Sequence, residues 1–89
     1  MDEVFVGEVT HYYPKINVAV ISIVEQLNAG DSVRFKSPES RTVKVDFEQK
    51  VGSMEIEHQK IEVAEPGQVV AIRVNQRVRK KDRAYKKIK

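Results

Sequence analysis

The chain has 89 residues, no cysteine and a net charge of +3 at neutral pH. This length predicts one domain, residues 1–89, with a single hydrophobic core and little room for a deep active-site cleft. The lack of cysteine excludes disulfides, zinc–thiolate sites and thiol nucleophiles, and it fits a reducing compartment. Residues 1–9 do not form a signal peptide, and no stretch approaches the ~18 apolar residues of a membrane helix. We therefore expect a cytoplasmic protein without membrane contact.

The first half of the chain shows the alternation of β-strands. Residues 16–24 (INVAVISIV) are apolar on both faces and rich in β-branched side chains, which predicts a strand that is covered on two sides or curves around a barrel. Residues 31–36 and 41–49 alternate between apolar and polar side chains. Before them, Gly7 interrupts an apolar strand and predicts a bulge or a close backbone approach. Val4, Val6 and Val9 open the first strand, and the inward positions are predicted to be Val33, Phe35, Val43, Val45 and Phe47.

The second half continues this pattern. Met54, Ile56 and His58 are predicted to share one face of a strand, with Glu55 and Glu57 on the other. Another two-sided apolar strand covers residues 68–74, and a short last strand runs through Ala84, Tyr85 and Ile88. Turn residues separate the strands at Pro14-Lys15, Asn28 to Asp31, Ser37 to Ser40, Pro66-Gly67 and Lys80 to Asp82. Six or seven short strands indicate an all-β protein, either a small antiparallel barrel or a sandwich.

The stretch LNAGDSVRF, residues 27–35, raises the question of a phosphate or metal site. A phosphate cradle needs backbone amides that lead into a helix N-terminus, whereas this stretch leads into an alternating strand. We therefore expect Gly30 to supply the turn conformation and Asp31 to cap the turn through its side chain.

Basic residues are concentrated at the end of the chain. Residues 73–89 carry nine basic residues and one acidic residue, a net charge of +8, whereas residues 1–72 carry −5. This asymmetry predicts contact with a polyanion, above all RNA, through phosphate neutralisation without base specificity. The alternative is a solvated, poorly ordered segment that binds nothing. The predicted nucleic-acid contacts within the basic C-terminal segment 77–89 are Arg77, Arg79, Lys80, Lys81, Arg83, Lys86 and Lys87.

The stretch HYYPK, residues 11–15, provides two further candidate contacts, Tyr12 and Lys15. Adjacent tyrosines on a strand point to opposite faces, so one fills the core while the other is exposed. The exposed ring could stack on a base while Lys15 neutralises a phosphate. The alternative is that the second tyrosine covers a neighbouring strand.

Residues 53–74 (SMEIEHQKIEVAEPGQVVAIRV) resemble the second domain of the translation elongation factor Tu and one-alpha family. The family-motif positions include Glu55, His58, Pro66 and Gly67, and residues 27–35 and 78–86 are similar to the flanking parts of that domain. The resemblance implies a closed antiparallel β-barrel of six or seven strands that contacts structured RNA or the ribosome. It also implies that Glu55 corresponds to a residue beside the terminal adenosine of a bound transfer RNA.

The sequence departs from that family in several places. No phosphate-binding loop is present, so we expect no GTPase domain and no nucleotide cofactor. Asn17 and Lys81 stand where the family usually has glycine. These departures weigh against capture of aminoacyl transfer RNA. A similar barrel also occurs at the C-terminus of collagenase-like U32 peptidases, which implies an accessory protein outside translation.

Catalysis and metal binding are not expected. On one strand, Glu55 and His58 would point to opposite faces and could not converge on a metal. No serine lies in a nucleophile elbow, and paired carboxylates would need a cleft that a small barrel does not offer. We therefore expect a non-enzymatic module without cofactors or metals that binds RNA or the ribosome. The alternative is a protein-interaction module that uses its edge strands and the acidic face around Glu55, Glu57 and Glu62, for example as an accessory of a U32-type peptidase.

Overall fold

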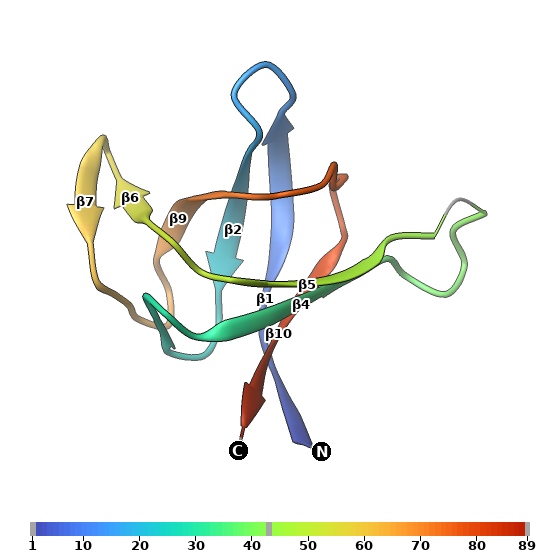
Figure 1. Ribbon diagram of the computed structural model, residues 1–89, viewed down its shortest axis with the longest axis horizontal. Helices are drawn as coiled ribbons and strands as arrows, with labels where there is room; N and C mark the ends of the chain where they lie inside the picture. The colour runs from blue at the N-terminus through green and yellow to red at the C-terminus, as the bar shows by residue number, and fades with distance from the viewer. Residues whose placement is uncertain (1, 43, 89) are drawn as a thin grey trace.

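The computed structural model describes residues 2–42 and 44–88, and every helix or strand assigned within them is a β-strand (Figure 1). The all-β class predicted from the sequence is confirmed. Val43, predicted to face inward, and Lys89 of the basic segment lie outside the described residues. The strands are β1 (Asp2–Tyr13), β2 (Val18–Ile23), β3 (Leu27–Asn28), β4 (Ser32–Lys36), β5 (Asp46–Lys50), β6 (Met54–Ile56), β7 (Gln59–Ile61), β8 (Val63–Ala64), β9 (Val69–Arg73) and β10 (Arg83–Ile88).

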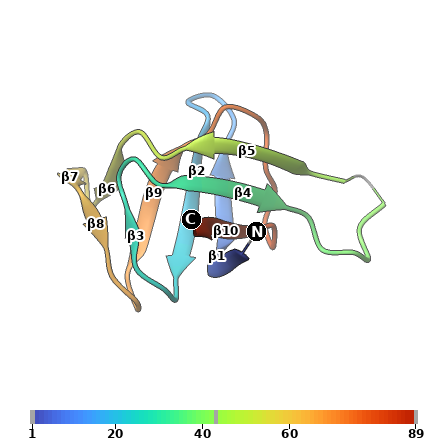
Figure 2. The ribbon, with the colours of Figure 1, turned by 60° about the horizontal axis from the view of Figure 1, so that its bottom comes forward.

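Eight of these strands form one antiparallel sheet in the order β5-β4-β10-β1-β2-β9-β6-β7, and β3 pairs with β8 in a second, two-stranded sheet. The large sheet curls around the hydrophobic core, as the two views in Figures 1 and 2 show. Alternation positions the core side chains: Val33 and Phe35 of β4 are buried, while Arg34 between them points outward. Of the inward positions predicted from the sequence, Val33, Phe35 and Phe47 are confirmed.

The large sheet is open, so the prediction of a closed barrel is wrong. Strands β5 and β7 form its two edges, and no ladder joins them in the described part of the chain. A side chain spans the distance from β5 to the end of β9. The Gln49 side-chain nitrogen donates to the Arg73 carbonyl over 2.9 Å, and its oxygen accepts from the Asn75 N–H over 2.7 Å. These two hydrogen bonds hold the curled sheet together where backbone pairing stops.

The predicted count of six or seven strands is too low, because β3 and β8 are only two residues long and because the turn that separates β6 from β7 contains no glycine. Strands β6 and β7 form a hairpin whose two central residues, Glu57 and His58, have φ angles of 49° and 67°. A two-residue turn of this kind normally uses Asn or Gly, so the sequence gives no signal for it. The prediction that His58 continues the strand of Met54 and Ile56 is therefore wrong, since His58 lies in the turn.

Gly7 lies where β1 passes closest to β2. A Cβ atom at this position would lie 2.4 Å from the Ser22 carbonyl oxygen and 2.7 Å from Cγ2 of Ile21. The pairing of β1 with β10 also shifts register between Phe5 and Gly7. The predicted bulge and close backbone approach are confirmed.

The turn at residues 28–31 has the structure predicted from its sequence. Gly30 has a φ angle of 93°, and the Asp31 carboxylate accepts a hydrogen bond of 2.9 Å from the Asn28 N–H. Gly67 has the same φ angle, and the segment before it contains β8, which pairs with β3. Both turns thus contain a glycine with a positive φ angle and a side-chain oxygen that accepts a hydrogen bond from the backbone N–H three residues before it.

Residues 83–88 of the basic C-terminal segment form a strand of the sheet. Strand β10 lies between β1 and β4, and Asp2 pairs with Ile88, so the two ends of the described chain lie side by side (Figure 1). The predicted last strand is confirmed. The alternative of a poorly ordered tail is wrong for residues 83–88, because this strand has a neighbour on each side.

Candidate functional site

A groove of about 450 Å³ lies between the β1–β2 turn and the β6–β7 hairpin. Its walls come from outward-facing positions of neighbouring strands, because Tyr13 is opposite Val18 and Glu55 is opposite Ala71. The apolar wall consists of Tyr13, Ile16, Val18 and Ala71. The polar wall consists of Ser53, Glu55, His58 and Arg73. This mixture of apolar surface and a few polar groups is typical of a binding site.

The tyrosine at the groove is Tyr13, whereas Tyr12, the predicted nucleic-acid contact, is partly buried. The pairing of β1 with β2 shifts register between Val9 and His11, so Tyr12 comes to lie opposite the buried Ala19. Tyr12 packs against the core and donates a hydrogen bond of 3.1 Å to Oδ1 of Asn17. Tyr13 is 47% exposed. Strand β1 also shifts register between Phe5 and Gly7, so its two bulges together return Tyr12 to the side of the buried Val6.

The tip of the β1–β2 hairpin is held by Asn17 and presents Ile16. Asn17 has a φ angle of 56°, a conformation that asparagine tolerates better than most residues. Its carbonyl accepts a hydrogen bond of 2.8 Å from the Val74 N–H, which fixes the turn against the end of β9. Ile16 is 54% exposed at the groove. Lys15, predicted as a phosphate contact, is exposed in the same turn.

Three charged or titratable side chains line the polar side of the groove. Glu55 and Arg73 are diagonal neighbours on β6 and β9, since Glu55 is opposite Ala71. Neither takes part in an ion pair within residues 2–42 and 44–88. The prediction that Glu55 and His58 point apart is wrong, because the turn places both at the groove. In the described part of the chain, no group of three His, Cys, Asp or Glu side chains could hold a metal.

The basic residues predicted to bind nucleic acid are distributed over a loop and a central strand. Arg77, Arg79, Lys80 and Lys81 belong to the connection between β9 and β10, and Arg83, Lys86 and Lys87 belong to β10. Two lysines of β10 make contacts within the molecule: Lys86 Nζ donates to the Gln26 carbonyl over 2.6 Å, and Lys87 pairs with Glu48. Since Lys86 and Lys87 are consecutive on a strand, they do not share a face.

Asp82 organises the loop that carries the other basic residues. Its side chain is 0% exposed, pairs with the Arg41 guanidinium and accepts a hydrogen bond of 2.8 Å from the Arg79 N–H. Arg41 also donates to the Lys80 carbonyl over 2.7 Å. Lys81, with a φ angle of 80°, donates its N–H to the Val9 carbonyl over 2.8 Å. The loop is therefore joined both to β1 and to the connection between β4 and β5.

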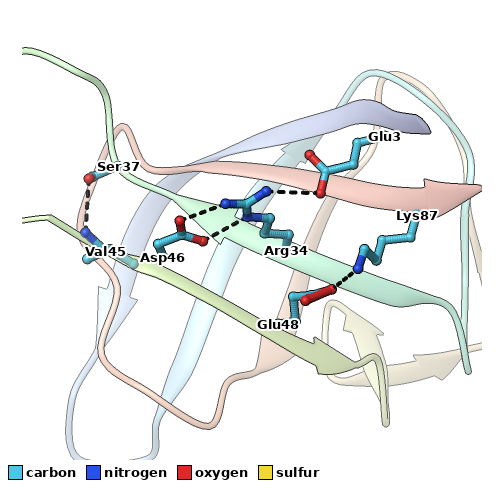
Figure 3. Close-up of polar contacts among 7 residues, drawn as sticks. All are labelled: Glu3, Arg34, Ser37, Val45, Asp46, Glu48 and Lys87. Atoms are coloured by element: carbon cyan, nitrogen blue, oxygen red, sulfur yellow. Dashed lines mark hydrogen bonds and ion pairs between the residues drawn. The ribbon is translucent and has the colours of Figure 1, made fainter. Parts of the chain in front are cut away.

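The outer face of β4, β5 and β10 carries charged side chains that form ion pairs with one another (Figure 3). Arg34 donates two hydrogen bonds of 2.7 Å to the Asp46 carboxylate and one of 3.4 Å to Glu3. The bond from Arg34 lowers the pKa of Asp46, and the same bond raises the pKa of Arg34 above its ordinary value. Lys87 and Glu48 form a second pair on this face. This face has the charged character expected of a solvated sheet surface.

The chain is similar to known proteins in fold and in sequence, although it matches no family model. Its fold matches two crystal structures of the C-terminal domain of a Geobacillus thermoleovorans protein described as a U32 peptidase. One has a TM-score of 0.82 over 94% of this chain and 92% of that domain, and the other has a TM-score of 0.79 over 90% and 95%. Both are 24% identical in sequence, so the likeness concerns the fold: the chain has the architecture of that C-terminal domain.

A curated relative shows a closer sequence similarity. An uncharacterized protease of Methanocaldococcus jannaschii is 34% identical over 80 residues, which are 90% of this chain and 19% of that protease. The chain thus spans about one fifth of the length of the relative it matches. In residues 2–42 and 44–88, no helix is long and apolar enough to cross a membrane.

These comparisons correct two predictions from the sequence. The structural neighbours are peptidase C-terminal domains, so the assignment to the translation elongation factor Tu and one-alpha family is wrong. RNA and the ribosome were predicted partners because of that resemblance and the basic segment. The protease and peptidase relatives give these partners no support. A similar pattern of strands and turns does not carry function with it.

Proposed function

We propose that this chain is a non-enzymatic protein-binding module that works with the catalytic region of a U32-type peptidase. The observation that carries the proposal is the similarity to the peptidase C-terminal domains, which extends over 90–94% of the chain. The identity with only about one fifth of the M. jannaschii protease supports the same interpretation. In that relative, the matching segment is one part of a much larger protein.

Features of the described surface suit a protein-binding role. The groove combines an apolar wall with Glu55, His58 and Arg73, a composition that fits a protein or peptide ligand. Two further acidic residues, Glu57 in the β6–β7 turn and Glu62 directly after β7, are exposed. Within residues 2–42 and 44–88, β7 pairs with β6 alone, so it also leaves a strand edge available for contact.

Binding to a peptidase tests the proposal. The probe is the catalytic region of the U32-type peptidase from the same organism, produced without any segment that resembles this chain. Titration calorimetry should detect a complex with a dissociation constant of about 10 µM or tighter. An unrelated peptidase of similar size is the control and should give no heat of binding. Cell fractionation should place the complex in the cytoplasm, as the sequence predicts.

A further inference from the structure

The outer face of β2 and β9 differs from the rest of the sheet surface. Its outward positions on β9 include Val69 and Ala71, and those on β2 include Val18 and Val20. Cross-strand pairing makes them neighbours, because Val20 is opposite Ala71. Val69 is 53% exposed. We call these four residues, together with Tyr13 and Ile16 of the adjoining groove, the apolar face.

The sequence of these strands has the pattern of a sheet covered on both sides. On β2 and β9, every inward position is apolar and so are most outward positions, with Ser22 and Arg73 as the polar exceptions, and the structure buries only the inward set. The ion-paired face of β4, β5 and β10 shows how the same sheet looks where it is solvated, with Arg34, Asp46 and Lys87 pointing outward. An apolar surface that is contiguous across neighbouring strands marks an interaction site.

Polar residues border the apolar face where it meets the groove. Glu55, His58 and Arg73 lie along this border, and among the described residues no ion pair involves Glu55 or Arg73. An apolar centre with a polar rim is the usual composition of a protein–protein or interdomain interface. Charged groups on the rim set the orientation of the partner more than the affinity.

We infer that the apolar face is the surface that packs against the catalytic region of a U32-type peptidase. This inference rests on the proposed function and adds the surface of contact. The choice of this partner rests on the length of the relative: the M. jannaschii protease has about four fifths of its chain outside the segment that matches this one. That length is ample for a further domain, and domains of one chain commonly bury about 600–1,500 Å² against each other.

A set of surface variants tests this surface in the same calorimetric titration. Ile16→Ser/Val69→Ser changes two exposed positions of the apolar face and should weaken binding at least about tenfold. Lys36→Ser/Lys50→Ser changes two exposed positions on β4 and β5 and should stay within about twofold of the native affinity. Thermal unfolding of each variant verifies that it is folded. Hydrogen exchange of the native complex is an independent measurement and should show slower exchange of amides 15–17.

The outcomes separate this inference from the proposed function. If the native chain and the Ile16/Val69 variant bind equally well, the inference that the apolar face makes the contact is overturned, while the proposed function stands. If Glu57→Gln/Glu62→Gln loses binding instead, the contact is the acidic face, and the inference is again overturned. Self-association of the native chain that the Ile16/Val69 variant abolishes would assign the face to a second copy. Absence of binding by the native chain would remove the proposed function and this inference with it.

Discussion

Replacement of Arg41 by alanine tests how the loop before β10 is held. The Asp82 carboxylate is fully buried, and its partners are the Arg41 guanidinium and the Arg79 N–H. Arg41→Ala leaves this buried charge with one backbone donor and also removes the hydrogen bond to the Lys80 carbonyl. Loss of one partner of a buried ion pair costs about 3–5 kcal/mol. Because the Arg41 side chain is 17% exposed and water can partly replace it, we expect a loss of about 2–3 kcal/mol.

Unfolding followed by circular dichroism measures this loss. For a domain of this size, the expected destabilisation lowers the melting temperature by about 10–20 °C. Arg77→Ala, at an exposed position of the same loop, is the matched control and should change stability by less than about 0.5 kcal/mol. Asp82→Asn added to Arg41→Ala should recover part of the loss, because no charge is then left buried without its counter-ion. An Arg41→Ala variant as stable as the control would refute the reasoning.

Three further predictions concern single positions. Gly7→Ala should destabilise the protein by about 1–3 kcal/mol in urea unfolding, because the new Cβ would lie 2.4 Å from the Ser22 carbonyl oxygen; native-like stability would contradict the close approach. Lys81→Gly should stabilise it by about 0.5 kcal/mol, since glycine adopts a φ angle of 80° without strain; a loss of stability would contradict this. The pKa of Asp46 is lowered by the bond from Arg34, so this pair stabilises the fold above the ordinary pKa of 3.8. That contribution should disappear as the pH falls through the lower folded value, and Asp46→Asn should flatten this part of the pH–stability curve; an unchanged curve would argue against the pair.

Strand positions and glycine turns could be predicted from the sequence because their signals are local. Alternation predicted the buried Val33 and Phe35, and the spacing of Gly30 and Asp31 predicted a capped turn. Gly7 was identifiable because an isolated glycine in a strand usually marks a bulge or a close contact. Each of these inferences needs only a few consecutive residues.

The open sheet and the groove could not be predicted, because both depend on non-local pairing. Whether two edges of a curled sheet join is decided by strands far apart in the chain, and here the side chain of Gln49 replaces a backbone ladder. The groove was missed for two further reasons. The register shifts in β1 make the side of Tyr13 depend on its pairing partners, and a turn without glycine moves His58 off its predicted strand. The signal that was available is the two-sided apolar pattern of residues 16–24 and 68–74.

The charge of the basic segment does not by itself predict RNA binding, because a count of charges ignores the ion pairs that they form within the molecule. Lys87 pairs with Glu48 across β4, and the positively charged loop forms around Asp82, its single acidic residue. A run of lysines near a chain end thus forms a central strand whose charges are partly satisfied within the sheet. The charge asymmetry was real, but it did not identify a partner.

The most direct experiment is the calorimetric titration of the native chain with the catalytic region of the U32-type peptidase from the same organism. The proposed function predicts a saturable complex with one-to-one stoichiometry and a dissociation constant of about 10 µM or tighter. No detectable binding at partner concentrations of about 100 µM would contradict it.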